Sequence, residues 1–353
     1  MTIKSQSFLN KYIKKKPFII AELSANHNGS LRQAKKLISI AKEAGADAVK
    51  LQTFTPSLIT SNSNNNFFKI TKGLWKGYNL FSLYNKAQTP KKWHSELFNY
   101  AKQKKIICFS SAFDPENVID LEKLKCPIYK VASFEMLHEP LIESIAKTKK
   151  PIIISTGIAN LKEITQSYNL AKKYKIKDIT LLYCVSNYPS KSSDFNINNI
   201  EILKKKFKCK IGFSDHSIGS KISMLAVAKG AEVVEKHICL EGDNESLDNE
   251  FSLKGKEQIK EFVNDLRTSS IMTNKKNFFR SLNEKNNIKF RRSVFSVKDI
   301  LKGEKFNKDN IKIIRPGYGV SPIFYKKILN KKSPIKINKN NPITKKILNK
   351  IYL

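Results

Sequence analysis

The most constraining feature of this chain is a regular alternation of short β-prone runs with amphipathic, helix-like segments. Eight strand-like runs follow one another from residue 18 onward, at 18–23, 48–54, 106–113, 128–133, 151–157, 179–186, 210–216 and 233–240. Successive β/α units place their strands in parallel in one sheet, and eight units are the number that closes into a barrel. The alternation therefore predicts an α/β fold, a (β/α)8 TIM barrel, with a doubly wound open sheet as the alternative.

Helix start signals support this division of the chain. Ser30 followed by Gln33 has the spacing of a capping box, and apolar residues then recur on one face until Gly45. Further start signals are Thr89-Pro90, Asp114-Pro115 and Asn160 with Glu163.

A barrel collects its chemistry at the carboxyl ends of its strands. The residues at or just beyond these predicted ends are mostly lysines, hydroxyls, carboxylates and imidazoles: Glu22, Lys50, Gln52, Ser110, Ser111, Lys130, Ser133, Glu135, Ser155, Ser186, Tyr188, Ser214, His216 and His237. Side chains alternate along a strand, so pairs two residues apart, such as Lys50 with Gln52 and Ser133 with Glu135, are expected on one face. Strand ends without a function would also be polar, but we would not expect them to combine lysine, hydroxyl and imidazole side chains in this way.

Two of the five histidines end the last two predicted strands. His216 and His237 are 21 residues apart, and the residues between them predict one helix and one strand. Neighbouring parallel strands bring both imidazoles to the same end of the sheet, where they can hold one metal ion. Imidazole suits Mn and several other metals, so the pair alone does not select one. The alternative is two unrelated polar residues.

The net charge of +35 suggests a nucleic-acid or membrane-surface partner, but its composition argues against one. Arginine, which reads phosphate and base edges, occurs at only six of the 65 basic positions, and lysine is spread along the chain. No apolar run is long enough to cross a membrane, the N-terminus lacks a signal-peptide core, and the five cysteines form no CxxC pair. We predict a reduced, cytoplasmic protein with no nucleic-acid or membrane partner.

The chain divides into four predicted regions. Residues 1–17 form a basic extension, 18–266 the barrel, 267–284 a linker, and 285–353 a small β-rich domain with Gly and Pro turns. Residues 57–88 interrupt the barrel after its second strand. This insertion begins with a Ser/Asn run and continues with aromatic residues, which fits either a lid over the barrel mouth or a surface loop.

Motifs along the chain resemble those of the sialic acid synthase family. AELSANHNGS, AGADAVKLQTF, CFSSAFD, YKVASFE, ISTGIA, GFSDHSIG and VVEKHICL occur in the order seen in that family, and RRSVFSVKDILKGEKF with IRPGYGVSP is similar to its C-terminal antifreeze-like (SAF) domain. The resemblance covers residues 18–345. LWKGYNLFSLYNKAQTPKKWH, RRSVF and IRPGYGVSP resemble the pseudaminic acid branch more than the N-acetylneuraminate branch.

The resemblance implies an enzyme that condenses phosphoenolpyruvate with an acetamido sugar to give a nine-carbon nonulosonic acid and phosphate. For the pseudaminic acid branch the sugar is 2,4-diacetamido-2,4,6-trideoxy-L-altrose. The alternative within the family is an N-acetylneuraminate or legionaminate synthase that uses another acetamido sugar. A hypothesis from a different functional class is a basic binding protein that keeps the barrel fold but has no catalytic activity.

The resemblance also implies roles for individual residues. It places a divalent metal, Mn2+, at His216 and His237, with substrate oxygens and water completing the coordination. It assigns phosphoenolpyruvate contacts to Lys50, Ser111, Lys130, Ser133, Ser155, Ser186 and Ser214. Ser111 and Ser186 stand where relatives often have Thr and Asn. The first exchange keeps a hydroxyl, whereas the second leaves the contact at Ser186 open.

Sugar-binding and acid/base positions of the family correspond to Glu22, Gln52, Glu135, Tyr188 and Asp248. We expect Glu22 to orient sugar hydroxyls and Glu135 to be the base for the water that attacks the intermediate, although either carboxylate can instead be a plain ion-pair partner of a lysine. Arg315 matches a position that reaches into a partner subunit's active site and contacts an N-acetyl group, which implies a domain-swapped homodimer.

Overall fold

The computed structural model describes residues 17–275 and 277–352, so the predicted basic extension 1–17 lies outside it except for Pro17. Eight parallel strands form the centre: β1 (Phe18–Glu22), β2 (Ala48–Thr53), β3 (Ile107–Ala112), β4 (Tyr129–Val131), β5 (Ile152–Ser155), β6 (Ile179–Cys184), β7 (Lys210–Asp215) and β8 (Val233–Cys239). Each strand pairs with the next, and β1 also pairs with β8. The sheet is therefore closed, which confirms the predicted barrel over the open sheet.

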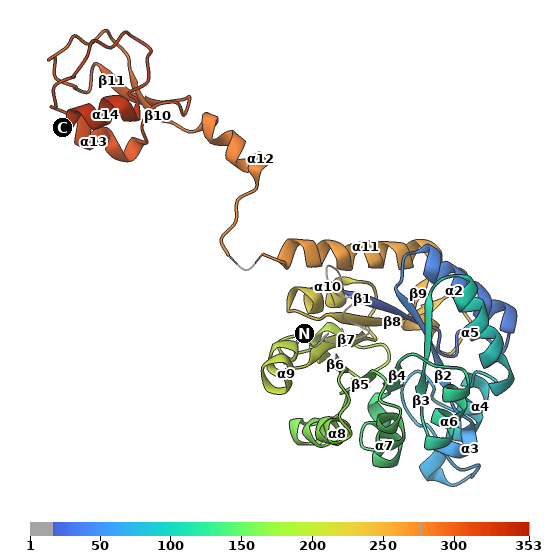
Figure 1. Cartoon of the computed structure of the whole chain (residues 1–353). Coiled ribbons are helices and arrows are strands. Elements are labelled where there is room, and N and C mark those ends of the chain that lie inside the picture. Colours follow the sequence, from blue (N-terminus) through green and yellow to red (C-terminus); the bar gives the residue numbers. More distant parts are fainter. Residues whose placement is uncertain (1–16, 276, 353) are drawn as a thin grey trace. The chain divides into compact units, whose positions relative to one another are not determined.

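Helices follow the strands and surround them (Figure 1). The helix after each successive strand is α2 (Leu31–Glu43), α5 (His94–Gln103), α6 (Pro115–Lys123), α7 (Glu139–Lys147), α8 (Leu161–Lys173), α9 (Asn199–Phe207), α10 (Lys221–Ala228) and α11 (Gly255–Thr273). Three of the predicted starts have their caps: the Ser30 hydroxyl accepts from the Gln33 N–H, Asp114 accepts from the Glu116 N–H, and Asn160 makes a reciprocal capping box with Glu163. The fourth differs, because α5 begins at His94 rather than at Thr89-Pro90.

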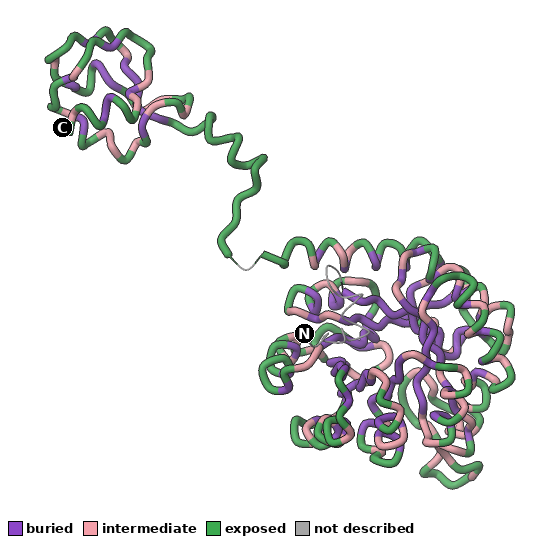
Figure 2. The backbone as a smooth tube through the Cα atoms, in the orientation of Figure 1, coloured by how far each residue is buried: buried purple, intermediate pink, exposed green. Residues whose placement is uncertain are grey.

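The core lies between the strands and the inner faces of these helices. Nearly every strand residue is buried, whereas the outer helix faces are exposed (Figure 2). In α2 the buried positions are Ala34, Leu37, Ile38 and Ala41, whose spacing places them on one face of the helix. Burial of a leucine or isoleucine side chain contributes about 1.5–3 kcal/mol, so this face holds the helix on the sheet.

Short elements complete the barrel's loops. The insertion after β2 contains α3 (Pro56–Ile59), a 3-10 turn η1 (Asn66–Phe68) and α4 (Leu80–Ala87), and the turn η2 (Lys91–Trp93) leads into α5. The remaining short elements are η3 (Ser133–Glu135), η4 (Ser192–Asp194), η5 (Asn249–Phe251) and strand β9 (Leu253–Lys254), which pairs with β8.

The contacts divide the chain into two units between residues 274 and 275. Helix α11 extends to Thr273, so it occupies the first part of the range that we predicted as linker. The second unit contains α12 (Leu282–Lys285), η6 (Asn286–Phe290), the antiparallel strands β10 (Ser293–Ser296) and β11 (Ile311–Ile314), η7 (Pro322–Phe324), α13 (Tyr325–Ile328) and α14 (Lys345–Ile351). Its own core includes Val294, Phe306 and Ile337.

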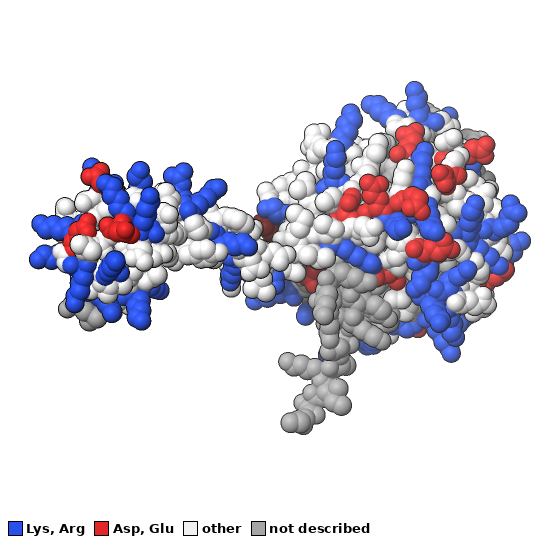
Figure 3. Space-filling model, turned by 90° about the horizontal axis from the view of Figure 1, so that it is seen from above, with Lys and Arg blue, Asp and Glu red and all other residues white. Residues whose placement is uncertain are grey.

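Lysine and arginine side chains are spread over the visible face of both units, with Asp and Glu among them (Figure 3). This distribution agrees with lysine enrichment on solvated faces. Within the described residues, no helix is long and apolar enough to cross a membrane.

Candidate active site

A cavity of about 420 Å³ opens at the carboxyl ends of the barrel strands, with lining residues from all eight strand ends and from the insertion. Twelve of the predicted site residues line it: Lys50, Gln52, Ser111, Lys130, Ser133, Glu135, Ser155, Tyr188, Ser214, His216, His237 and Asp248. Glu22 and Ser186 lie beside these residues, as described below. The barrel topology therefore brings together residues that are up to about 200 positions apart in sequence.

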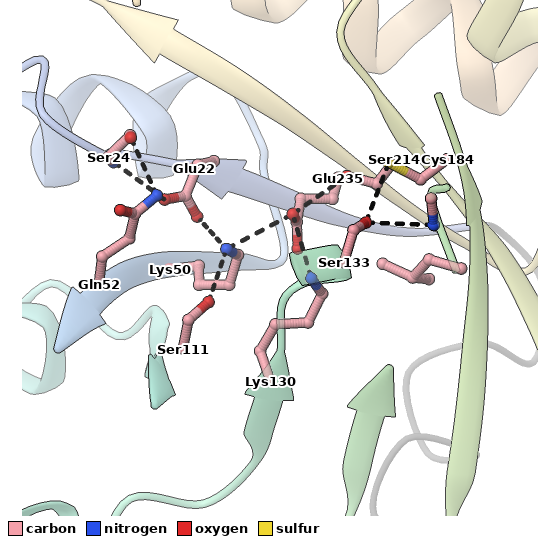
Figure 4. A network of polar contacts seen from close by, with 12 residues as sticks. Glu22, Ser24, Lys50, Gln52, Ser111, Lys130, Ser133, Cys184, Ser214 and Glu235 are labelled. Carbon is pink, nitrogen blue, oxygen red and sulfur yellow. Dashed lines mark hydrogen bonds and ion pairs between the residues drawn. The ribbon is translucent and has the colours of Figure 1, made fainter. Parts of the chain in front are cut away.

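The inner part of the cavity is a network of buried charges (Figure 4). The Lys50 Nζ lies 2.6 Å from Glu22 Oε2 and 3.4 Å from Glu235 Oε1, and it donates to the Ser111 hydroxyl over 3.0 Å. Burial by itself lowers the pKa of Lys50, but the Glu22 and Glu235 carboxylates more than offset this and raise it. Lys50 is therefore a permanent cation in the cavity wall.

A second lysine, Lys130, shares Glu235 with Lys50. Its Nζ lies 3.8 Å from Glu235 Oε1, which also accepts from the Ser214 hydroxyl at 3.2 Å. Burial lowers the pKa of Lys130. Burial also disfavours ionised Glu235, but the two lysines offset this and lower its pKa to about 2. One buried carboxylate thus holds two cations side by side, which leaves the inner cavity suited to an anionic ligand.

Glu22 lies behind this surface. It is fully buried and is not among the residues that line the cavity. Besides its ion pair with Lys50, its Oε1 accepts from the Gln52 side chain at 3.1 Å and from the Ser24 N–H at 3.0 Å. The geometry favours the ion-pair alternative for Glu22, in which the carboxylate holds Lys50 and Gln52 in place.

Four polar groups of the cavity wall are buried without a hydrogen-bond partner among the described residues: Glu135 Oε2, Ser155 Oγ, Glu235 Oε2 and His237 Nδ1, the last of which has an ion-pair partner described below. Buried polar atoms are nearly always paired, so such a group in a cavity wall indicates a place for a polar ligand. Burial raises the pKa of Glu135 to about 7. This carboxyl can exchange a proton near neutral pH.

Ser133 and Glu135 reach the cavity by a different route from the predicted one. They form the 3-10 turn η3 after the short strand β4, so strand alternation does not apply to them. The turn still directs both side chains to the cavity wall.

His216 and His237 lie together, with ring centroids 5.5 Å apart. The His216 Nδ1 lies 2.9 Å from the Val185 carbonyl oxygen, so this nitrogen carries the proton and Nε2 is the atom left to bind a metal. The His237 Nδ1 is 3.3 Å from Asp248 Oδ2, an arrangement typical of carboxylates that orient metal-binding imidazoles. Two imidazoles with such supporting partners fit a divalent ion.

The protein supplies only part of a metal coordination sphere. Among the residues that the structure describes, no group of three or more His, Cys, Asp or Glu side chains is arranged to hold a metal. A metal at His216 and His237 would therefore need further oxygen ligands from substrate and water.

The outer part of the cavity is apolar and aromatic. The insertion contributes Ile59, Ile70, Trp75, Leu80, Leu83, Tyr84 and Ala87. The Trp75 Nε1 donates to the Leu247 carbonyl over 3.0 Å, and its ring lies 5.3 Å from that of Tyr188. Tyr188 in turn lies 4.4 Å from the His216 ring. The aromatic part of the insertion thus packs over the barrel mouth, next to the histidine pair.

Ser186 does not line the cavity, but it lies against Gly157 just beyond β5. A Cβ at Gly157 would meet Ser186 Oγ at 2.1 Å and Ser133 Oγ at 2.7 Å, so any larger residue here would displace both hydroxyls. The Gly157 N–H donates to Ser133 Oγ over 3.2 Å. Arg315 lies in the second unit, exposed and directly after β11.

Sequence reasoning missed two important residues, Glu235 and Trp75. Glu235 carried a readable signal, because it stands two residues before His237 on the same strand and therefore shares its face. Trp75 lies in an insertion without strand or helix periodicity, so nothing local predicted where its ring would pack.

Comparison with known proteins matches most of the chain. The NeuB family model matches residues 37–278, and the SAF domain model matches residues 291–348. The chain is 45% identical to the pseudaminic acid synthase of Campylobacter jejuni, over 90% of this chain and 93% of the relative. It is 38% identical to the N,N'-diacetyllegionaminic acid synthase of the same species, over 90% of this chain and 96% of that protein.

Among solved structures, the N-acetylneuraminic acid (sialic acid) synthetase of Leptospira borgpetersenii, in complex with citrate, has a TM-score of 0.69. It is 30% identical in sequence, and the match covers 78% of this chain and 91% of that one.

Proposed function

Because the chain belongs to the NeuB family and carries a C-terminal SAF domain, we propose that it is a pseudaminic acid synthase. The reaction joins phosphoenolpyruvate, 2,4-diacetamido-2,4,6-trideoxy-L-altrose and water to give pseudaminate and phosphate. The observation that carries the proposal is a single cavity that combines two buried lysines, an imidazole pair and a carboxyl with a raised pKa.

Phosphoenolpyruvate fits the inner part of the cavity. Its phosphate and carboxylate need cations and hydroxyl donors in a confined site. Lys50 and Lys130 supply the cations, and the hydroxyls of Ser111, Ser155 and Ser214 line the same space. Glu22 and Glu235 together balance the charge of the two lysines, but Glu22 does not line the cavity, so two cations and one carboxylate line its inner part. Glu22, which is buried behind Lys50, serves to position that lysine.

The sialic acid synthase family is metal-dependent, and His216 with His237 would hold the ion, which we take to be Mn2+. When bound, a divalent ion polarises the aldehyde oxygen of the sugar and makes its carbon a better electrophile. The Val185 carbonyl and Asp248 keep the two imidazoles in their binding orientation.

We assign Glu135 as the base that accepts a proton from the attacking water. A new carbon–carbon bond forms between the phosphoenolpyruvate methylene carbon and the sugar aldehyde carbon, water adds to the former enol carbon, and phosphate leaves. Glu135 Oε2 is buried without a hydrogen-bond partner among the described residues, and its pKa of about 7 lets the carboxylate accept the water's proton at neutral pH.

The lining of the outer part of the cavity favours a deoxygenated acetamido sugar as the substrate. Trp75, Leu83 and Tyr84 present apolar and aromatic surface that suits acetamido methyl groups and a C6 methyl better than a hydroxymethyl group. The higher identity to a pseudaminic acid synthase than to an N,N'-diacetyllegionaminic acid synthase supports the same choice.

The proposal extends to the assembly and its location. Arg315 is exposed after β11, as an arginine that serves a partner's active site would have to be. We propose a domain-swapped homodimer in the cytoplasm, in which Arg315 contacts an N-acetyl group of the sugar bound by the partner.

The test is phosphate release from phosphoenolpyruvate with Mn2+ and a panel of acetamido sugars. We expect release with 2,4-diacetamido-2,4,6-trideoxy-L-altrose and its loss when EDTA removes the metal. Absence of release with every sugar would overturn the synthase assignment. Release with N-acetylmannosamine or the legionaminate precursor alone would overturn the sugar assignment and leave the reaction class standing.

A further inference from the structure

A buried ion pair separate from the cavity network lies on the outer side of the two strands that carry the histidines. Asp215 directly precedes His216 at the end of β7, and Lys236 directly precedes His237 on β8. The two residues are register partners in the sheet. Both are buried and neither lines the cavity, because alternate residues of a strand point to opposite faces.

The pair is tied to the backbone on both sides of His216. Lys236 Nζ lies 3.2 Å from Asp215 Oδ2 and also donates to the Ser217 carbonyl oxygen. Asp215 Oδ1 accepts from the Ser217 N–H at 2.8 Å and from its hydroxyl at 2.6 Å. Its Oδ2 accepts from the Ser223 hydroxyl of α10 at 2.6 Å. His216 therefore stands between two residues, 215 and 217, that are held from outside the cavity.

A buried ion pair of this kind needs a reason other than stability. The desolvation of two charges offsets most of their attraction, so well-packed apolar residues often serve as well. What an ion pair adds is a fixed geometry, and here it fixes the ends of β7 and β8 where the two imidazoles must meet.

We propose that Asp215 and Lys236 are positioning residues that set the spacing and facing of His216 and His237, and so the affinity of the site for its divalent ion. The inference rests on the proposed metal site of the synthase. Neither residue touches substrate or metal, and the pair acts by holding the backbone.

The test is Mn2+ binding to metal-free protein, measured by calorimetry and by the electron paramagnetic resonance signal of free Mn2+. The double variant Asp215→Leu/Lys236→Met removes both charges together and keeps apolar volume. We expect it to bind Mn2+ about 10–100-fold more weakly, as is typical when support of metal ligands is lost. Its melting temperature should also fall, because the buried Ser217 and Ser223 donors lose their acceptor, so Mn2+ binding is compared at a temperature where the variant is folded.

The chain offers a matched control. Buried Asp178 and half-buried Lys210 form another ion pair, at the opposite end of the neighbouring strands β6 and β7. Asp178→Leu/Lys210→Met removes the same charges without touching the histidine end, and we expect unchanged Mn2+ affinity. If the first double variant fails to fold, Ser223→Ala, which removes only the bond from α10, should still weaken Mn2+ binding by about threefold or more.

Wild-type Mn2+ affinity in the folded Asp215→Leu/Lys236→Met variant would overturn the inference. If that variant does not fold, wild-type affinity in Ser223→Ala would overturn it. So would an equal loss in the control pair, which would indicate a general effect of barrel stability. A wild-type protein that binds Mn2+ but turns over no sugar would overturn the proposed function and leave the positioning role standing.

Discussion

The inner and outer parts of the cavity are built in different ways. The inner part consists of side chains from the ends of parallel strands, held by buried ion pairs such as Lys50 with Glu22 and Lys130 with Glu235. The outer part consists of apolar and aromatic side chains, many of them from the insertion 57–88, with Trp75 anchored by one hydrogen bond to Leu247. The difference suggests a division of labour in which the strands supply the reaction and the insertion supplies the choice of sugar. Changes to the inner part should therefore reduce turnover with any sugar, whereas changes to the outer part should alter the ranking of sugars.

The largest effect is expected at the histidine pair. His216→Ala or His237→Ala removes one of the two proposed protein ligands to the metal, and we expect turnover to fall by about 10³-fold or more while the barrel stays folded. Phosphate release measures turnover, and circular dichroism shows whether the barrel is folded. His138→Ala is the matched control, because His138 stands at the N-cap position of α7, makes no side-chain capping bond there and does not line the cavity. Near-normal activity in either site variant would mean that the metal assignment is wrong.

Lys130→Met should have the next largest effect. It removes one cation from the inner wall while Glu235 keeps its second partner, Lys50, so we expect a folded protein. Loss of one preorganised charged donor typically costs about 10²–10³-fold in turnover. Steady-state kinetics should show the loss with every accepted sugar. Exposed Lys102→Met is the control, and a Lys130→Met effect confined to one sugar would contradict the division between inner and outer parts.

The pH dependence should follow Glu135, whose pKa burial raises to about 7. If the carboxylate accepts a proton from water, turnover should rise with pH through about 7 and fall by about tenfold per unit below it, reaching about 100-fold at pH 5. Glu135→Gln should remove this limb along with most of the activity. A wild-type profile that is flat from pH 5 to 8 would exclude Glu135 as the base.

The same shift has a consequence for stability. Glu135 holds its proton up to about pH 7 in the folded protein but releases it near 4.5 when unfolded. Between these values the folded state binds more protons, so the free energy of unfolding falls as the pH rises and then levels off. At pH 8 the Glu135→Gln variant should be more stable by up to about 3 kcal/mol, and at pH 4 it should match wild type. Urea unfolding at the two pH values measures this difference, and an equal stability difference at both would contradict it.

The two parts of the cavity also differ in how far the sequence predicts them. The inner residues follow from strand periodicity and from the rule that a barrel gathers its functional residues at the carboxyl ends of its strands, and Lys50, Ser214 and His237 all line the cavity there. Glu235 was within reach of the same argument. Sequence did not predict that Glu22 would be fully covered, because burial depends on which neighbour, here Lys50 and Gln52, reaches over it.

The outer part could not be predicted residue by residue. The sequence of the insertion predicts a lid or a surface loop with aromatic residues, but its short helices α3 and α4 have no long amphipathic pattern that would fix their orientation. The position of Trp75 depends on tertiary contacts with Leu247 and Tyr188, which are more than 100 residues away. Only the assembled barrel brings these partners together.

Trp75→Ala tests the outer part directly and should give the smallest of these effects on chemistry. Removing the ring opens the apolar wall next to Tyr188, so we expect KM for the preferred sugar to rise by about tenfold while KM for phosphoenolpyruvate changes less than about twofold. The preference over N-acetylmannosamine should narrow, because an apolar wall discriminates between substrates by only about 1–3 kcal/mol per methyl-sized group. Phe67→Ala is the control, because Phe67 belongs to the same insertion but is 90% exposed. An equal rise in both KM values would mean that Trp75 closes the whole site rather than selecting the sugar, and the insertion would then be a lid and not a specificity wall.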